Sequence, residues 1–410
     1  MIGIRSITYQ LPKEFGKEDI KRISDISRIW DSSYNLIRTQ RVSLCQFSEA
    51  IDVRNLKPLS ILCDETRIRW FNVPIDPYSS KSPSELFKFG YKVLNECSRA
   101  FVNIVGVKDN IINRDILNES SNLVRKVSQM STSGKDNFRL GISINVNSDC
   151  PFFPFSYSSG VAGFSIALEL TQDINILLDE YRNSNLSDMR NIIISTLEPQ
   201  IQKINDIAES ISKQSGLIFK GFDFSLAPII DPNGSVITIL NSLGVYNFGK
   251  TGGMFATSYL TNILKYFAAN FKSVGFSGVM YSLLEDLELC SINNERGVSM
   301  EQLITLSTMC GCGVDMVPVY GKITNTEMMS IYLEVAAISC RLHKPLGVRI
   351  LPINQCQRNE RRFTAFQDDP DFIANTRCVA PDINILIPFG NEFQYLKTSG
   401  TDSVDFQLLR

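Results

Sequence analysis

The stretch Ser307–Ile350 decides the fold class of this 410-residue chain. It contains the run MCGCGVDMVP (Met309–Pro318), which follows a helical pattern and leads into an apolar segment typical of a strand. A second helical pattern and a second strand-like run, Gly347–Leu351, come after it. Helix-to-strand repeats build open α/β sheets and barrels, and polar residues at their strand ends form binding sites. The stretch therefore predicts an α/β fold with a site at its strand ends.

The rest of the chain repeats this alternation. Period-2 patterns and short apolar runs predict strands over Gly3–Leu11, Thr39–Leu44, Thr66–Val73, Ala100–Val107, Phe138–Val146, Gly163–Glu169, Leu217–Leu226, Gly275–Leu283 and Gly313–Val319. Helical spacing predicts helices over Lys17–Ile37, Ser84–Cys97, Arg114–Gln129 and Ser187–Lys213. About ten strands separated mostly by helices favour a largely parallel sheet closed into a large α/β barrel with outer helices. No linker divides the chain, so we expect one domain over residues 1–410.

The charge balance argues against nucleic acid as a partner. Lys and Arg number 41 against 43 Asp and Glu, and no long basic block offers a footprint for a phosphate backbone. No apolar run is long enough to cross a membrane, and the opening residues lack the apolar core of a secretory signal. We therefore expect a cytoplasmic protein whose ten cysteines are mostly free thiols.

Several motifs along the chain resemble those of one family. They are IRSIT (Ile4–Thr8), CPFFPF (Cys150–Phe155), GFDFSLAP (Gly221–Pro228), GFSG (Gly275–Gly278), the run Ser307–Lys322 and the run Lys344–Pro352. Together they resemble the uncharacterised family catalogued as domain of unknown function 711. The resemblance implies a fold similar to the ten-stranded α/β barrels of pyruvate formate-lyase and anaerobic ribonucleotide reductase, with a site inside the barrel. Those enzymes carry a glycyl radical on a loop of Arg-Val-(Ser/Ala)-Gly-(Tyr/Phe) type, which is absent near this C-terminus, so we expect no glycyl-radical chemistry.

Four carboxylates fall at or just beyond the ends of apolar strand-like runs, namely Asp223, Glu285, Asp286 and Asp315. Carboxylates there could bind a divalent cation such as Mg²⁺, Mn²⁺ or Ca²⁺, or could act as general acid and base. The alternative is that they cap helices or pair with a nearby cation, namely Arg349, Lys322 or Lys344. Strands that end on the same side of a closed sheet would place Asp223 and Asp315 in one cavity.

The thiols and the single histidine offer fewer options. Cys310 matches the family's Cys-Gly-Thr-Gly motif whereas Cys312 departs from it, so Cys310 is the better candidate for a role in the site. Nothing near Cys310 in the sequence is cationic enough to lower a thiol pKa, which favours a buried structural thiol. His343 follows a helical stretch and precedes Pro345, an arrangement typical of a helix end. With one histidine, Ser-His-Asp and Cys-His catalysis are excluded unless His343 reaches the site.

Gly244–Thr251 matches the phosphate-loop pattern Gly-x₄-Gly-Lys-Thr and follows a strand-like run, Val236–Leu240. The bulky intervening residues argue against a nucleotide loop. A weaker version remains, in which Lys250, Thr251 and Gly252 present a cation and backbone N–H groups to an anion.

Three functions follow, in order of preference. The first is an enzyme that binds a small anionic metabolite inside the barrel, with Arg349, Lys250, Thr251 and Gly252 for the anion. Asp223, Glu285, Asp286, Asp315 and Cys310 would then serve the chemistry, with a divalent cation left open as cofactor. The second is a non-catalytic ligand-binding or regulatory protein on the same barrel, and the third is a phosphate-loop NTPase. The expected partner is a small molecule, and a homo-oligomeric state is left open.

Overall fold

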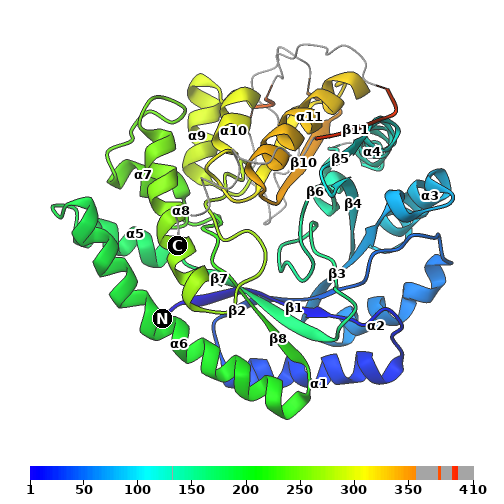
Figure 1. Cartoon of the computed structure of the whole chain (residues 1–410), viewed down its shortest axis with the longest axis horizontal. Helices are drawn as coiled ribbons and strands as arrows, with labels where there is room; N and C mark the ends of the chain where they lie inside the picture. Colours follow the sequence, from blue (N-terminus) through cyan, green and yellow to red (C-terminus); the bar gives the residue numbers. More distant parts are fainter. Residues whose placement is uncertain (132, 357–376, 380–389, 396–410) are drawn as a thin grey trace.

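A nine-strand sheet forms the centre of the molecule (Figure 1). The computed structural model describes residues 1–131, 133–356, 377–379 and 390–395. The strands run in the order β8 (Ile218–Asp223), β7 (Gly163–Glu169), β1 (Gly3–Gln10), β2 (Ile37–Ser43), β3 (Ile68–Ile75), β4 (Ala100–Lys108), β6 (Leu140–Ile144), β10 (Leu346–Ile353) and β9 (Gly313–Tyr320). Two short strands, β5 (Ile111–Asn113) and β11 (Glu392–Gln394), extend β4 at its edge. The predicted mixed α/β class is confirmed.

The sheet consists of two parallel blocks of opposite direction. Strands β1, β2, β3, β4 and β6 are parallel to one another. Strand β7 pairs antiparallel with β1, and β10 pairs antiparallel with β6, while β8 and β9 are parallel to those two strands. The strand direction reverses at two places in the sheet, between β7 and β1 and between β6 and β10. The strands of one block therefore start at the edge of the sheet where the strands of the other block end.

No strand ladder joins the end strands β8 and β9 within the described ranges. The segment 272–282 lies between them and makes isolated parallel bridges, Phe222 with Ser273 and Leu226 with Val279 on one side, and Ser282 with Asp315 on the other. We expected a strand over Gly275–Leu283, and this expectation is wrong. Gly275 and Ser277 have φ angles of 75° and 46°, which are incompatible with extended backbone.

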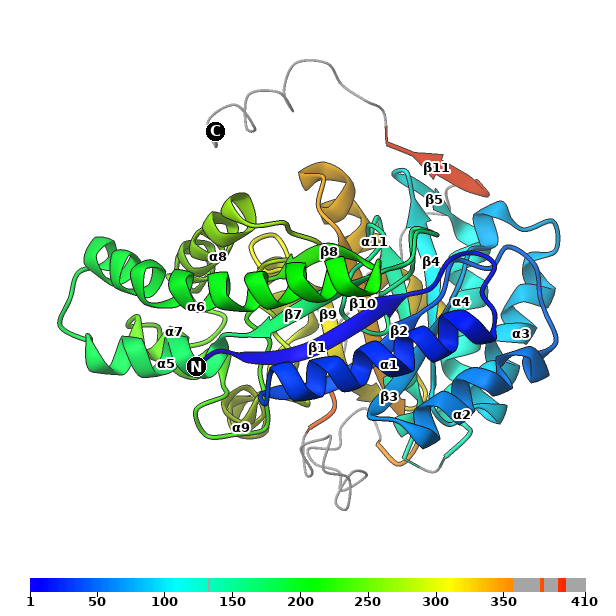
Figure 2. The same cartoon turned by 90° about the horizontal axis from the view of Figure 1, so that it is seen from below.

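The helices cover the outer face of the sheet, as the two views show (Figures 1 and 2). They are α1 (Lys17–Ser33), α2 (Lys57–Glu65), α3 (Pro83–Glu96), α4 (Arg114–Ser128), α5 (Thr171–Glu180), α6 (Leu186–Ser215), α7 (Val236–Ser242), α8 (Gly253–Asn270), α9 (Leu287–Arg296), α10 (Met300–Leu306) and α11 (Asn325–Leu342). The expected helix Ser187–Lys213 is confirmed as α6, whose buried side chains include Met189, Ile193 and Leu197. No helix in the described ranges is long and apolar enough to cross a membrane.

Two sequence predictions around these helices are wrong. The helix expected over Lys17–Ile37 ends at Ser33, because β2 begins at Ile37. The strand-like run Val236–Leu240 is the helix α7, whose N-terminus is capped by the Ser235 hydroxyl. A five-residue run with four apolar side chains fits a buried strand or a buried helix equally well, and here the preceding cap decides for the helix.

A loop fills part of the space inside the curved sheet, and the inner face of the sheet is polar for that reason. The Thr8 hydroxyl donates to the carbonyl oxygen of Pro151, and the Asn72 amide donates to those of Pro154 and Ser156. A Cβ atom at position 347 would lie 2.5 Å from the ring of Phe155, so only glycine fits there. These contacts fix the loop Cys150–Ser156 as a rigid wall.

Candidate functional site

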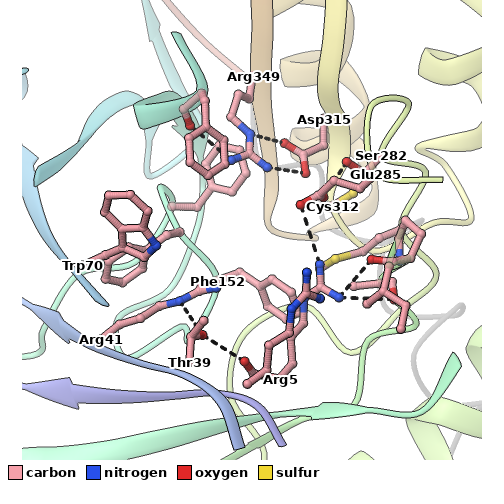
Figure 3. A pocket seen from close by; sticks show the side chains of 18 of the residues that line it. Arg5, Thr39, Arg41, Trp70, Phe152, Ser282, Glu285, Cys312, Asp315 and Arg349 are labelled. Atoms are coloured by element: carbon pink, nitrogen blue, oxygen red, sulfur yellow. Dashed lines mark hydrogen bonds and ion pairs between the residues drawn. The ribbon is translucent and has the colours of Figure 1, made fainter. Parts of the chain in front are cut away.

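A cavity lined by charged and aromatic side chains lies near the first residues of β1 to β4, beside the residues that follow β8 and the segment 272–282. We name it the arginine-lined cavity (Figure 3). It contains about 900 Å³ of empty space, including the part open to solvent. Five arginines line it, namely Arg5, Arg38, Arg41, Arg69 and Arg349. The other walls are two carboxylates, Glu285 and Asp315, and an aromatic group that consists of Trp70, Phe101, Phe138, Phe152, Phe153, Phe155 and Phe276.

One side of the cavity is a neutralised ion pair. Arg349 Nε and Nη2 donate to the two carboxylate oxygens of Asp315 at 2.7 Å and 2.9 Å, and Arg349 Nη1 donates to the Phe138 carbonyl at 3.2 Å. Both side chains are less than one tenth exposed. Burial alone would lower the pKa of Arg349, but the carboxylate raises it above its ordinary value. The guanidinium fork is therefore already occupied by a protein carboxylate.

A second buried arginine, Arg5, is held by weaker contacts. Its guanidinium donates to the Pro228 carbonyl at 3.0 Å and lies 3.6 Å from Glu169 and 3.8 Å from Glu285. Burial lowers the pKa of Arg5, and the neighbouring Arg38 lowers it further. Glu169 is shared with Arg38 at 3.2 Å, so two arginines draw on one carboxylate. This side of the cavity carries more cationic than anionic groups.

Arg41 differs from Arg349 and Arg5 in its neighbours. Its Nε donates to the Thr39 hydroxyl at 3.1 Å and its Cζ lies 5.3 Å from the centre of the Phe153 ring. Among the described residues no carboxylate oxygen lies within 4.0 Å of its guanidinium. Burial, together with Arg5 and Arg38, lowers the pKa of Arg41 to about 9, so it is still a cation at neutral pH. A half-buried cation beside other cations needs an anion from elsewhere.

Glu285 is the cavity carboxylate with the most open coordination. One oxygen accepts from the Ser282 hydroxyl at 2.7 Å, and the other lies 3.8 Å from Arg5 Nη2. Its side chain is 20% exposed, whereas that of Asp315 is 9% exposed and has both oxygens on Arg349. Burial alone would raise the pKa of Glu285, but Arg5 and Arg349 lower it below its ordinary value. Glu285 is thus ionised at neutral pH. Its carboxylate can accept a proton or a further hydrogen bond from a ligand.

The structure brings Glu285, Asp315 and Arg349 to this cavity but not Asp223 or Asp286. Asp223 is fully buried, and its oxygens accept from the backbone N–H groups of Ser225, Phe276 and Ser277. Asp286 caps α9 at Leu289 and also accepts from the Val236 N–H. Burial raises the pKa of both carboxyls. Asp286 follows the alternative in which these carboxylates cap helices, whereas Asp223 accepts from N–H groups outside any helix, which neither alternative anticipated.

The two thiols also differ from expectation. Cys312 is on the cavity wall, whereas Cys310 is not among the lining residues. The expectation that no cation lowers the Cys310 thiol pKa is wrong, because the chain folds Lys344 back against this segment. A hydrogen bond from Cys312, followed in effect by Lys344, lowers the pKa of Cys310 to about 6. Eight cysteines are free, and Cys356 is paired with Cys378.

Lys250, Thr251 and Gly252 line a separate surface hollow with Glu301 and Gln302, away from the arginine-lined cavity. The segment before them is α7 and not a strand, so the strand–loop–helix context of a phosphate loop is missing. His343 ends α11 with a φ of 48° and is also remote from the cavity. No group of three or more potential metal ligands occurs among the residues that the structure describes.

Sequence reasoning missed Arg5 and Arg41. A period-2 pattern could not assign their faces, because the β1–β7 ladder shifts register between Ile4 and Ser6, and the β2–β3 ladder shifts between Gln40 and Arg41. The available signal was the presence of arginines in three strands that otherwise carry no charged side chain.

Comparison with known proteins identifies the class. The family described as "Uncharacterised ACR (DUF711)" matches residues 38–362, which is most of the chain. The chain belongs to this family, as its motifs predicted. The predicted likeness to the pyruvate formate-lyase barrels remains a prediction.

Individual relatives are named UPF0210 proteins. The chain is 26% identical to one from Pyrobaculum aerophilum over 270 residues, which cover 64% of this chain and 59% of the relative. It is 24% identical to one from Pyrobaculum arsenaticum over 220 residues, covering 52% and 49%, and 25% identical to one from Acetivibrio thermocellus over 265 residues, covering 61% and 57%. The chain thus spans about half to three fifths of the length of these relatives.

Proposed function

We propose that this protein is an enzyme that binds a small organic anion in the arginine-lined cavity. The observation that carries the proposal is Arg41, a cation without a carboxylate partner in the described structure, surrounded by Arg5 and Arg38. An anionic ligand group beside Arg41 would supply the missing negative charge. A planar guanidinium suits a carboxylate or a phosphate, which it can bind through two parallel hydrogen bonds.

The aromatic wall suggests the rest of the ligand. Trp70, Phe101 and Phe138 pack edge to face with centroids 5.0 to 6.4 Å apart, and Phe153 joins them beneath Arg41. Rings at this density bury apolar ligand surface and exclude water, which strengthens the attraction between an anion and its arginine. The ligand we propose is therefore an anion with a small apolar or aromatic body.

Glu285 is the proposed acid–base residue of the enzyme. It is ionised, it faces the same cavity as Arg41, and its Arg5 contact is long enough to leave an oxygen accessible to a ligand proton. Asp315 is assigned to holding Arg349 in place. In this assignment Arg41 binds the anion and Glu285 carries out the acid–base chemistry, and both side chains line the same cavity.

The proposed architecture for the site is a completed barrel. The bridges that the segment 272–282 makes to β8 and to β9 are all parallel, so it would add a fifth member to the block of β7, β8, β9 and β10. Two antiparallel blocks of five would then surround the loop Cys150–Ser156, with the cavity between that loop and one end of the barrel.

Calorimetry with phenyl phosphate and benzoate tests the binding. We expect one of these probes to bind with a dissociation constant below about 100 μM, and neutral benzyl alcohol to bind at least about tenfold more weakly. Arg41→Gln should weaken the anion at least about tenfold, whereas Arg28→Gln on the exposed face of α1 should not. Equal binding to the parent protein and to Arg41→Gln would refute this assignment.

Mass spectrometry of small molecules released from the purified, denatured protein tests the enzymatic part. The released compound is returned to fresh protein and its conversion followed by NMR. Conversion that is lost in Glu285→Gln while binding survives supports an enzyme. Binding without conversion supports the second candidate, a non-catalytic ligand-binding protein, which the pairing of both cavity carboxylates with arginines favours.

A further inference from the structure

We infer that Cys310 and Cys312 form a redox-active dithiol that a hydroperoxide entering through the arginine-lined cavity converts to a disulfide. The inference is independent of the proposed anion ligand. It rests on the placement of both sulfurs, on the rigidity of the backbone between them and on the lysine that faces them.

The two thiols are held side by side. Their Sγ atoms lie 4.0 Å and 3.9 Å from one acceptor, the carbonyl oxygen of Gly313. Residues 310–312 form a bend before β9 begins at Gly313, and both side chains of this bend approach the same carbonyl oxygen.

Glycine between the thiols fixes this arrangement. A Cβ on Gly311 would lie 2.9 Å from Gly278 Cα, so the segment packs backbone to backbone against the segment 272–282. The Gly311 N–H donates to the Val279 carbonyl at 2.6 Å, and the Cys312 carbonyl accepts from the Gly347 N–H at 2.8 Å. The backbone of this segment is therefore held on both sides, so the two side chains keep their positions relative to each other.

Lys344 gives the pair a thiolate. Its Nζ donates to the carbonyls of Ser307, Thr308 and Cys310 at 2.9, 3.2 and 2.5 Å, and within the described ranges no carboxylate lies within 4.0 Å of it. The contact with the Cys310 carbonyl places the ammonium group beside this residue, and Cys312 and Lys344 both lower the pKa of the Cys310 thiol. Cys312 keeps its proton, since burial and the adjacent thiolate raise its pKa well above the ordinary value.

The chemistry balances with hydrogen peroxide as the two-electron oxidant. The Cys310 thiolate attacks one peroxide oxygen, the O–O bond breaks, and the leaving hydroxide takes a proton to become water. The Cys312 thiol then loses its proton and attacks the Cys310 sulfenic acid, the S–O bond breaks, and a second water leaves. Both thiols are 1% exposed and only Cys312 is on the cavity wall, so a peroxide has to pass the Cys312 side chain to reach Cys310.

The test uses the native full-length protein and stoichiometric hydrogen peroxide, followed by denaturation, alkylation of free thiols and trypsin. The peptide Gly297–Lys322 contains these two cysteines and no other. We expect it to lose both alkylation sites together and to regain them after dithiothreitol. Cys63, a lone buried thiol whose pKa is raised to about 12 by burial, should remain alkylatable throughout.

Two variants assign the roles. In Cys312→Ser, dimedone should trap a sulfenic acid on Cys310, because no second thiol resolves it. In Cys310→Ser, Cys312 should stay reduced at the same peroxide dose. The inference is overturned if the parent peptide keeps both free thiols, or if its thiols oxidise one at a time to sulfinic acid without a disulfide.

Discussion

Two buried or half-buried arginines line the same cavity, Arg349 and Arg41, and they differ in whether a protein carboxylate neutralises their charge. Arg349 donates two charge-assisted hydrogen bonds to Asp315, and its charge is cancelled within the protein. Arg41 has a hydroxyl and an aromatic ring as neighbours and further cations nearby. The difference teaches that the most firmly held arginine of a cavity is not the one left available to an added anion. A paired arginine shapes the wall, whereas an unpaired one is available to an anion.

Breaking the paired corner should have the largest effect. Arg349→Met leaves the Asp315 carboxylate buried without its cation, and we expect a loss of about 3–5 kcal/mol in the free energy of unfolding. Urea denaturation measures it. The double variant Arg349→Met/Asp315→Leu removes both charges and should recover most of the loss. A single variant that costs less than about 1 kcal/mol would show that the pair is not the fixed wall described above.

The unpaired corner should respond in the opposite way. Arg41→Met removes a cation that other cations destabilise, so unfolding free energy should stay within about 1 kcal/mol of the parent or rise. The affinity for phenyl phosphate or benzoate should fall at least about tenfold in the same variant, because the ligand loses its charge partner. A large loss of stability together with unchanged probe affinity would reverse the roles of the two corners.

The pH dependence of stability should separate carboxylates that have an arginine from those that do not. The pKa of Glu285 is lowered in the folded state, so its contribution is present above the unfolded pKa, near 4.3, and is lost as pH falls through the folded value. The pKa of Asp223 is raised, so the folded state binds its proton more tightly. Its carboxyl therefore lowers stability as pH rises from about 3.9 through the folded value.

Urea titrations across this acidic range measure the two effects with opposite signs. In Glu285→Gln the free energy of unfolding should increase less with rising pH than in the parent protein. In Asp223→Asn it should increase more, because the contribution that decreases with pH is removed. If both variants change the slope in the same direction, the assignment of Arg5 as the partner that lowers the Glu285 pKa is wrong.

Most of the strands could be predicted because they are apolar, short and separated by helical patterns. The failures have local causes: one Ser235 hydroxyl turned the run Val236–Leu240 into a helix, and positive φ angles broke the strand expected at Gly275–Leu283. Asp315 and Glu285 were found as carboxylates next to apolar runs, but Asp315 lies near the start of β9 and Glu285 follows the segment 272–282, so the reason given for them was only partly right. Arg41 was missed because its face depends on a register shift in the ladder, which no local pattern reveals. The Lys344 contact with the Cys310 segment is likewise a long-range product of folding.

The smallest effect is expected at Lys250, where the chain offers a third cation for comparison. Its hollow is separate from the cavity, and Glu301 lies on its wall as a local source of negative charge. The segment before this loop is the helix α7 and not a strand. The loop therefore lacks the strand–loop–helix geometry that presents backbone N–H groups to phosphates. Lys250→Ala should therefore change unfolding free energy by no more than about 0.5 kcal/mol and leave the probe affinity of the arginine-lined cavity unchanged. ATP should show no binding to the parent protein by calorimetry. If the parent protein binds ATP with micromolar affinity and Lys250→Ala does not, the hollow at Lys250 is a second anion site. The contrast between Arg41 and Arg349 would then describe only one of the two anion sites.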